Sequence, residues 1–202
     1  MRRINKTTPL AEFIDYINSN HPSKWEDIPH SLRHDMRMYM LAFEQDCLCG
    51  YSEIPLTEND NSSHIDHFIK REHDHKKIFD WDNMIVSTID EDFGGKYKDN
   101  TYKIKKEEYS QIFNPTTEDM KQYIEFSEDG SINPQNNIDE KIKNKVMKTI
   151  EVFNLNHKSL KNRRRFLLEE LRKCKNVPKE SLLKFSQTRG FISLTEWFVN
   201  TY

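Results

Sequence analysis

The sequence has no apolar run approaching the roughly 20 residues that a membrane-spanning helix needs, and it contains only three cysteines. The charged start of the chain is not followed by a continuous apolar segment and a small-residue cleavage site, so we expect no export signal. Cys47, Cys49 and Cys174 are too few and too unevenly spaced for a disulfide framework. These absences argue against a membrane protein or a disulfide-stapled protein, and they favour a reducing cytoplasm.

Hydrophobic residues are also sparse for a chain of this length. They make up 35% of the 202 residues, while charged residues make up 32%. This length suits one substantial domain, or a small catalytic core with extra helices, and is too short for several independent domains. We therefore expect one compact unit with appendages, a modest core and a very polar surface.

The net charge of -2 conceals a strong polarity along the chain. Residues 141–202 contain 15 Lys/Arg and 5 Asp/Glu, a balance of about +10, whereas residues 1–140 contain 16 basic and 28 acidic residues, about -12. A basic half suits phosphate backbones or an acidic partner surface, and acidic clusters suit divalent cations. The alternative is that the two halves neutralise each other within the fold.

Apolar residues recur at helical spacing near both ends of the chain. The spacing predicts helices over about 9–18, over 31–45 and over two segments after residue 138, and the aromatic segment 191–202 is expected to be packed. The predicted stripes are Leu10, Phe13, Ile14 and Ile17; Leu32, Met36, Tyr39, Met40 and Phe43; Ile142, Val146, Met147, Ile150 and Phe153; and Leu160, Leu167, Leu168 and Leu171.

The segment from about 47 to 100 differs, because it holds half of the eight histidines and many turn residues, including those at 59–61 and 94–95. It predicts short strands, a loop and one helix. Residues 63–69 suit a strand whose end presents polar side chains, and residues 80–83 suit a helix entry that continues through Met84, Ile85 and Val86. Further on, Asp129-Gly130 predicts a tight hairpin turn, and the polar residues 133–137 are a linker candidate.

The segment from Ser63 to Gly95 contains the side chains that phosphodiester cleavage requires. That reaction needs a base for the attacking water, a cation that stabilises developing negative charge, and rigid placement of both. A histidine titrates near neutrality and can accept a proton, and carboxylates are the oxygen ligands that Mg²⁺ or Mn²⁺ prefers. On a strand, His64 shares a face with Asp66, whereas His67 points the other way unless the strand ends there.

The strings SHIDHFIKR, FDWDNMIVS and DEDFGGKYKDN occur in this order over about 40 residues and resemble the signature of HNH (ββα-metal) endonucleases. The resemblance implies that His67 is the general base and that Asp66 is a metal ligand. It implies that Asn83 opens a helix and orients the base. It also implies that Asp92, nine residues later, is a further ligand of Mg²⁺ or Mn²⁺.

Three further positions stay open at this point. His64 is a candidate second catalytic histidine, as a contact of the metal ligands, a phosphate ligand, a metal ligand or a plain strand residue. Lys96 and Lys98 are candidate phosphate contacts, or ordinary surface lysines. His73 and His75 suit a solvated loop, with phosphate contact as the alternative.

Many HNH proteins also hold a structural zinc in two cysteine pairs. Here the corresponding positions are Cys49, Ser52, Thr88 and Glu91, so one of four ligands remains and structural zinc is not expected. We therefore expect the core to be held by packing, with the flanking helices as candidates.

A closer resemblance covers most of residues 41–165. The strings LAFEQDCLCGYSEIPL, FSEDGSI and TIEVFNLNHKSLKNRRR, together with the strings above, are similar to PtuB-type HNH proteins of Septu anti-phage systems, including those carried by retrons. This resemblance implies a PtuA-type ATPase of the ABC/SMC class as partner and, in retron systems, a reverse transcriptase and msDNA. It implies a DNA or tRNA substrate, without choosing between them. The basic C-terminal helices then dock the ATPase or guide nucleic acid.

The resulting prediction is an α+β fold with a small ββα-metal core over residues 46–112. The core is flanked by an N-terminal helical segment over 1–45 and by a hairpin plus a mainly helical, basic region over 113–202. The predicted function is a metal-dependent endonuclease that serves as the effector of an anti-phage complex. The main alternative is a binding subunit that keeps the fold and has lost activity; a zinc-binding module of the transcription-factor kind has too few ligands.

Overall fold

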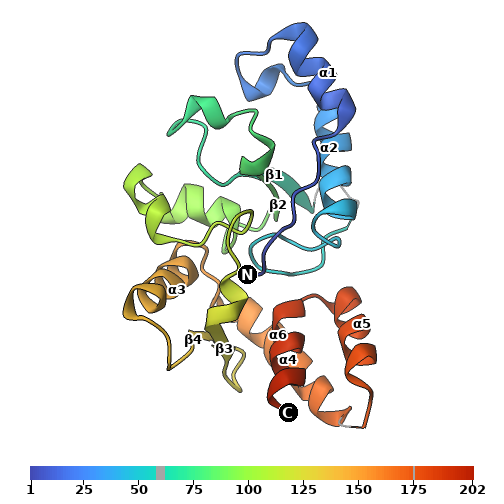
Figure 1. The fold of residues 1–202 in the computed structure, drawn as a ribbon, viewed down its shortest axis with the longest axis vertical. Coiled ribbons are helices and arrows are strands. Elements are labelled where there is room, and N and C mark those ends of the chain that lie inside the picture. Colours follow the sequence, from blue (N-terminus) through green and yellow to red (C-terminus); the bar gives the residue numbers. More distant parts are fainter. Residues whose placement is uncertain (58–61, 175) are drawn as a thin grey trace.

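The computed structural model describes residues 1–57, 62–174 and 176–202, so the turn predicted at 59–61 lies outside the described residues. The chain is a mixture of helices and two small sheets, which confirms the α+β prediction. Figure 1 shows α1 and α2 at one end, β1 and β2 in the middle, and the remaining elements at the other end. In chain order the elements are α1 (Ala11–Asn20), α2 (His30–Phe43), β1 (Ser63–His67), β2 (Met84–Thr88), β3 (Ile124–Phe126), β4 (Ile132–Pro134), α3 (Glu140–Val152), α4 (Lys158–Lys173), α5 (Lys179–Arg189) and α6 (Ile192–Thr201).

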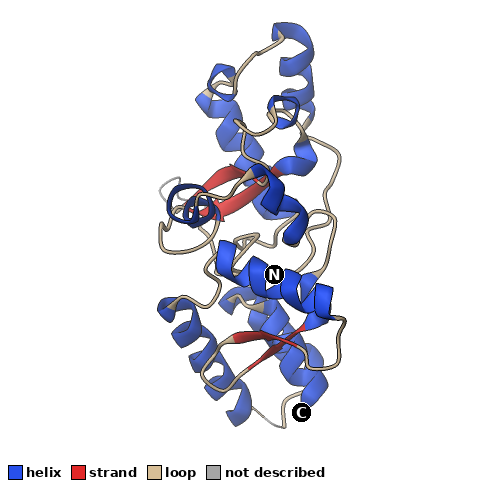
Figure 2. Cartoon of the chain, turned by 90° about the vertical axis from the view of Figure 1, so that its left-hand side faces the viewer, coloured by secondary structure: helices blue, strands red, loops and turns tan. Residues whose placement is uncertain are grey.

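The strands form two separate antiparallel pairs, seen as two red layers in Figure 2. In the first pair, His67 lies opposite Met84 and Ser63 lies opposite Thr88. After β2 the chain turns at Gly94, whose φ of 82° suits glycine, and enters a short helix that continues as a π-helix over Tyr97–Tyr102. Two strands followed by a short helix therefore make the middle of the molecule.

Most of the predicted elements are confirmed, with one clear correction. The predicted helices correspond to α1, α2, α3 and α4, and the hairpin around Gly130 corresponds to β3 and β4. The segment 191–202, which was expected to be packed, forms α6 with Phe198 and Val199 buried. Residues 81–83 form a single 3-10 turn, and Met84, Ile85 and Val86 belong to strand β2. The helix predicted after Asn83 is therefore wrong. A short apolar run that is buried on both faces fits a strand as well as a helix.

The core is continuous across the three predicted segments. Met36 and Met40 of α2, Ile85 and Val86 of β2, and Phe153 after α3 belong to one buried cluster. None of the helices within the described ranges is long and apolar enough to cross a membrane.

The turn that follows α2 is fastened to the C-terminal helices. Glu53 has a positive φ of 60°, and its carbonyl accepts a hydrogen bond from Phe191 N at 2.9 Å. The Glu53 carboxylate accepts two more, from Ser193 N at 2.9 Å and Ser193 Oγ at 2.6 Å. Glu53 and Ser193 are both buried. Residues that are 140 positions apart thus hold the middle of the molecule against α6.

An arginine lies in the apolar stripe of α4. Arg164 is 1% exposed and sits between Leu160 and Leu167 on the buried face. Its Nε donates to the Gly130 carbonyl at 2.6 Å, and its Nη2 donates to the Leu155 carbonyl at 2.7 Å. The guanidinium therefore ties the β3–β4 turn and the α3–α4 connection to α4.

Replacing Arg164 with methionine is expected to lower the free energy of unfolding by roughly 3 kcal/mol, because two buried carbonyls lose a charged donor. Arg163→Met is the matched control, since the neighbouring Arg163 is exposed and its replacement is expected to change stability by about 0.5 kcal/mol or less. Urea denaturation followed by circular dichroism measures both. Equal urea midpoints for the two variants would show that the hydrogen bonds of Arg164 do not contribute to the free energy of unfolding.

Candidate functional site

His67 is the last residue of β1 and is almost fully buried, with 6% exposure. Its Nε2 lies 2.9 Å from the Ile78 carbonyl oxygen, which can only accept, so Nε2 carries the proton. This leaves Nδ1 as the ring nitrogen with a free lone pair. Burial lowers the pKa of His67 to about 4, so the ring is neutral at physiological pH. The edge of the ring packs against Trp25, with ring centroids 4.8 Å apart.

Asn83 fixes the loop that carries the Ile78 carbonyl. Its Oδ1 accepts from Ile69 N at 2.8 Å, and its Nδ2 donates to the carbonyls of Ile69 and Lys77 at 3.0 and 3.1 Å. One side chain therefore closes both ends of the 69–77 loop. Since Lys77 precedes Ile78, this closure sets the position of the carbonyl that orients His67.

Asp66 precedes His67 and is 4% exposed. Its Oδ2 accepts a hydrogen bond from the Tyr51 hydroxyl at 2.6 Å. Burial, and after it the Asp66 charge, raises the pKa of Tyr51 well above its ordinary value, so the phenol stays a donor. On the other side, Asp66 packs against Gly95 so closely that a Cβ there would lie 2.6 Å from the Asp66 carboxyl carbon. The first turn of the helix after β2 can approach Asp66 only because this residue is glycine.

Lys98 is fully buried and supplies the positive charge beside Asp66. Its Nζ lies 3.5 Å from Asp66 Oδ2 and 2.6 Å from Asp99 Oδ1, and it donates to the carbonyls of His67 and Phe68 at 3.2 and 3.3 Å. Burial, followed by the Asp66 charge, raises the pKa of Asp99 to about 6 even though the ammonium opposes that shift. The expectation that Lys98 contacts phosphate is thus corrected: its ammonium points inward, at two carboxylates.

His64 lies on the same face of β1 as Asp66, as the alternation of a strand requires. Its Nε2 is 3.9 Å from Asp66 Oδ1, the oxygen not bound by Tyr51. This separation is too long for a direct hydrogen bond. Burial lowers the pKa of His64, which favours the neutral ring that a metal ion requires.

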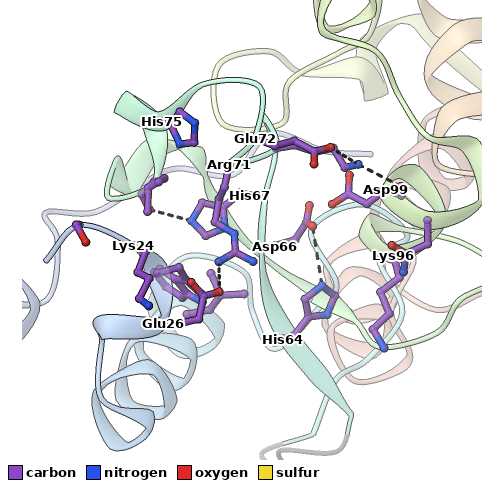
Figure 3. A pocket seen from close by; sticks show the side chains of 16 residues that line it. Lys24, Glu26, His64, Asp66, His67, Arg71, Glu72, His75, Lys96 and Asp99 are labelled. Carbon is purple, nitrogen blue, oxygen red and sulfur yellow. Dashed lines mark hydrogen bonds and ion pairs between the residues drawn. The ribbon is translucent and has the colours of Figure 1, made fainter.

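A cavity of about 620 Å³ opens in front of this strand end, and His64, Asp66 and His67 all line it (Figure 3). In the same view Asp66 lies between His64 and Asp99, and Arg71 is bound to Glu26 at 2.7 Å. The cationic side chains around the cavity are Lys24, Lys70, Arg71 and Lys96, and the carboxylates are Glu26, Asp66, Glu72 and Asp99. The cavity therefore presents mixed charge, with the imidazoles and Asp66 at its floor.

The two remaining predicted site residues, Lys96 and Asp92, lie in different places. Lys96 lines the cavity and is half-buried, with its Nζ 3.8 Å from Glu91 Oε1. Asp92 is absent from the cavity lining, and its carboxylate is exposed, with Oδ2 4.0 Å from His157 Nε2. The expected pairing of Asp92 with Asp66 is therefore corrected, since the loop after β2 carries Asp92 toward α4 instead.

The acidic residue that the structure brings beside Asp66 is Asp99. Neither it nor Tyr51 was singled out in the sequence. The only local signal for Asp99 is its place next to a lysine in the helix after Gly95. Tyr51 lies between Cys49 and Ser52, and nothing in that local sequence indicates its contact with Asp66. Within the described ranges, no group of three or more His, Cys, Asp or Glu side chains forms a ready metal cluster.

No protein-family model matches the chain, and no curated protein matches it.

Proposed function

We propose that the chain is a metal-dependent endonuclease of the HNH type that hydrolyses phosphodiester bonds of a nucleic acid. In this proposal β1, β2 and the short helix from Gly95 constitute the ββα core. The observation that carries it is the orientation of His67, whose Nε2–H is fixed on the Ile78 carbonyl by the loop that Asn83 closes. A neutral, rigidly held imidazole with one free nitrogen in a cavity meets the geometric requirement for a general base, although its pKa of about 4 makes it a weaker base than a free histidine.

In the proposed reaction, His67 Nδ1 takes a proton from a water that attacks the phosphorus atom. The ester P–O bond opposite the attacking water breaks, and the leaving oxygen takes a proton from solvent. Asn83 is a positioning residue. By closing the 69–77 loop it holds the Ile78 carbonyl in place, and so it keeps the Nδ1 lone pair of His67 oriented toward the water while the ring takes up the proton. Asp66 stabilises the protonated ring from the neighbouring position. Lys96 offers its ammonium to the phosphate at the cavity wall.

The residues at the cavity floor fit a divalent ion held by Asp66 Oδ1 and His64 Nε2. Neighbouring ligands of an octahedral ion with bonds of about 2.1 Å lie roughly 3.0 Å apart. These two atoms are 3.9 Å apart, so a small side-chain movement would bring both to one ion. Waters and the phosphate would complete the coordination. When bound, the ion offsets charge on the phosphate and on the leaving oxygen. A mixed carboxylate and imidazole pair suits Mn²⁺ better than Mg²⁺.

Replacing His64 with alanine is expected to raise the Mn²⁺ concentration for half-maximal cleavage by at least about tenfold, because one of two protein ligands is lost. Isothermal titration of Mn²⁺ into the protein without substrate gives a second readout, and Asp66→Asn is expected to weaken binding there as well. His73→Ala is the control, since His73 does not line this cavity and packs against Tyr109. Unchanged Mn²⁺ binding by the His64→Ala protein would show that His64 is not a metal ligand.

We further propose that the nuclease acts in the cytoplasm as the effector of an anti-phage complex with a PtuA-type ATPase, and in a retron setting with a reverse transcriptase and msDNA. The support is the sequence resemblance over residues 41–165. Co-expression with a genomically adjacent ATPase, followed by size-exclusion chromatography, tests it. Separate elution of the two proteins, with and without ATP, would contradict the proposed partnership.

One observation favours the second candidate, a non-catalytic subunit of the same complex. Asp66 has one oxygen committed to Tyr51 and Lys98, so a single oxygen faces His64 and the cavity. Incubation of the ATPase complex with DNA and tRNA in Mg²⁺ and in Mn²⁺ separates the two candidates. Cleavage that depends on His67 supports the nuclease, and a stable complex that cleaves neither substrate supports the binding subunit.

A further inference from the structure

A second, smaller cavity of about 190 Å³ adjoins the catalytic cavity. The two share Trp25, His64 and Ile65, so His64 faces both. The other wall of the small cavity is α2, which precedes the proposed nuclease core. A substrate strand that places one phosphate above His67 would therefore pass this cavity.

The lining of the small cavity is cationic. Its positive charge comes from the guanidinium groups of Arg33 and Arg37. The imidazoles of His30, His34 and His64 also line it, and among the residues described no carboxylate does. The catalytic cavity beside it has four carboxylates. Residues 1–140 carry a net charge of about -12. Two arginines in a cavity without a carboxylate among the described residues are therefore unusual for this part of the chain. The small cavity therefore favours an anion over a cation.

The spacing of these residues on α2 explains how one helix builds the wall. His30 lies three and four residues before Arg33 and His34, and Arg37 lies four and three residues after them, so the four share one face. Leu32, Met36 and Met40 are buried on another face. Arg37 is 5% exposed and is anchored on β1, because its Nη1 donates to Ser63 Oγ at 2.8 Å. The wall is thus rigidly attached to the strand that carries His64 and Asp66.

Arg33 is the residue of this wall that is least committed to the protein. Its Nε is inaccessible to solvent and has no hydrogen-bond partner within the described part of the chain. A buried donor without an acceptor costs free energy, and a small rotation of the Arg33 side chain toward the cavity would let an anion there accept from it. A guanidinium also offers paired donors that match phosphate oxygens.

We propose that the small cavity binds a phosphate of the nucleic-acid backbone next to the scissile phosphate, with Arg33 as its principal ligand and Arg37 as its fixed support. The proposal rests on the nuclease function and identifies its substrate class as a continuous strand that extends past the cleaved bond toward α2. The recognised chemistry is a phosphodiester, which DNA and RNA share.

The test measures binding separately from cleavage. Proteins carrying His67→Ala are titrated into fluorescein-labelled single-stranded DNA and RNA oligonucleotides of equal sequence, and the anisotropy gives Kd at several salt concentrations. Adding Arg33→Gln is expected to weaken binding about tenfold and to lower the salt dependence of log Kd by about 0.7, as for one lost phosphate contact on a single strand. Arg33→Lys is expected to recover part of the affinity, because it restores the charge without the paired donors.

Arg3→Gln is the matched control, since Arg3 is exposed and lies in neither cavity. It removes the same charge and is expected to leave Kd unchanged within about twofold. Circular dichroism melting confirms that each variant is folded. A single methylphosphonate linkage, which is neutral, is then moved along the oligonucleotide. One position is expected to weaken binding to the protein with Arg33 and to have no effect on the Arg33→Gln protein.

The outcomes separate this proposal from the function on which it rests. If Arg33→Gln binds as tightly as its parent, or no more weakly than Arg3→Gln, the phosphate subsite is refuted whether or not the wild type cleaves. If Arg33→Gln weakens binding as stated and the wild type cleaves neither DNA nor RNA, the anion subsite is supported and the nuclease is refuted. Equal loss on DNA and RNA supports backbone recognition. A loss confined to RNA points to the 2′-hydroxyl and contradicts it.

Discussion

Replacing His67 with alanine is expected to lower the rate of nucleic-acid cleavage about 10²–10⁴-fold, the usual contribution of a positioned general base. The reason lies in the geometry: Nε2–H is fixed on the Ile78 carbonyl, so Nδ1 is the only ring nitrogen that can accept a proton. Single-turnover kinetics with saturating Mn²⁺ measures the chemical step and leaves substrate affinity to be determined separately.

His67→Gln is the sharper variant, because glutamine can still donate a hydrogen bond to the Ile78 carbonyl but cannot act as a base. It is expected to be as inactive as His67→Ala while unfolding closer to wild type. His75→Ala is the control, since His75 lines the same cavity but is exposed and belongs to the far wall loop. Cleavage by His67→Gln within a few-fold of wild type would falsify the assignment of the base.

Replacing Lys98 with methionine is expected to lower the free energy of unfolding at neutral pH by about 3–5 kcal/mol, as for other buried charges that lose their partner. The ammonium is the counter-charge of both Asp66 and Asp99, and it also binds the backbone carbonyls at the end of β1. Without it, two carboxylates remain buried beside each other, so we also expect Lys98→Met to be inactive. Urea denaturation gives the stability change from the shift in midpoint.

Two further variants show whether the effect comes from this charge arrangement. Lys96→Met changes a half-buried lysine in the same helix whose ion pair with Glu91 is long, and it is expected to shift stability by about 0.5 kcal/mol or less. Lys98→Met combined with Asp99→Asn is expected to recover part of the lost stability, because one of the two unpaired carboxylates becomes neutral. Strict additivity of the two substitutions would contradict the proposed coupling.

The sequence predicted the local part of the site well. His64 and Asp66 share a face because they are two residues apart on a strand, and the polar strand end at His67 follows from the change in pattern there. The helical stripes of α2, α3 and α4 were equally visible, since amphipathic periodicity depends on neighbouring residues alone. The cationic face of α2 depends on the same three- and four-residue spacing, so it too is encoded locally in the sequence.

The prediction for Asp92 failed because a count of residues converts to distance only when the secondary structure is known. A helix advances about 1.5 Å per residue and a strand about 3.3 Å, so the strand β2 after Asn83 takes the chain much farther than the expected helix. The partners Tyr51, Lys98 and Asp99 could not be predicted from sequence either. They reach Asp66 from positions 15 to 33 residues away, and only tertiary packing decides such contacts.

The bonds between Glu53 and Ser193 have a consequence for how the protein is made. A ribosome synthesises β1 and β2 long before α6, so the nascent chain contains His64, Asp66 and His67 while the turn at Glu53 still lacks its partners. Contacts between residues so distant in sequence form late, because closing a long loop must precede them. The segment that carries the proposed site therefore gains its attachment to α6 only after residues 191–193 have been synthesised.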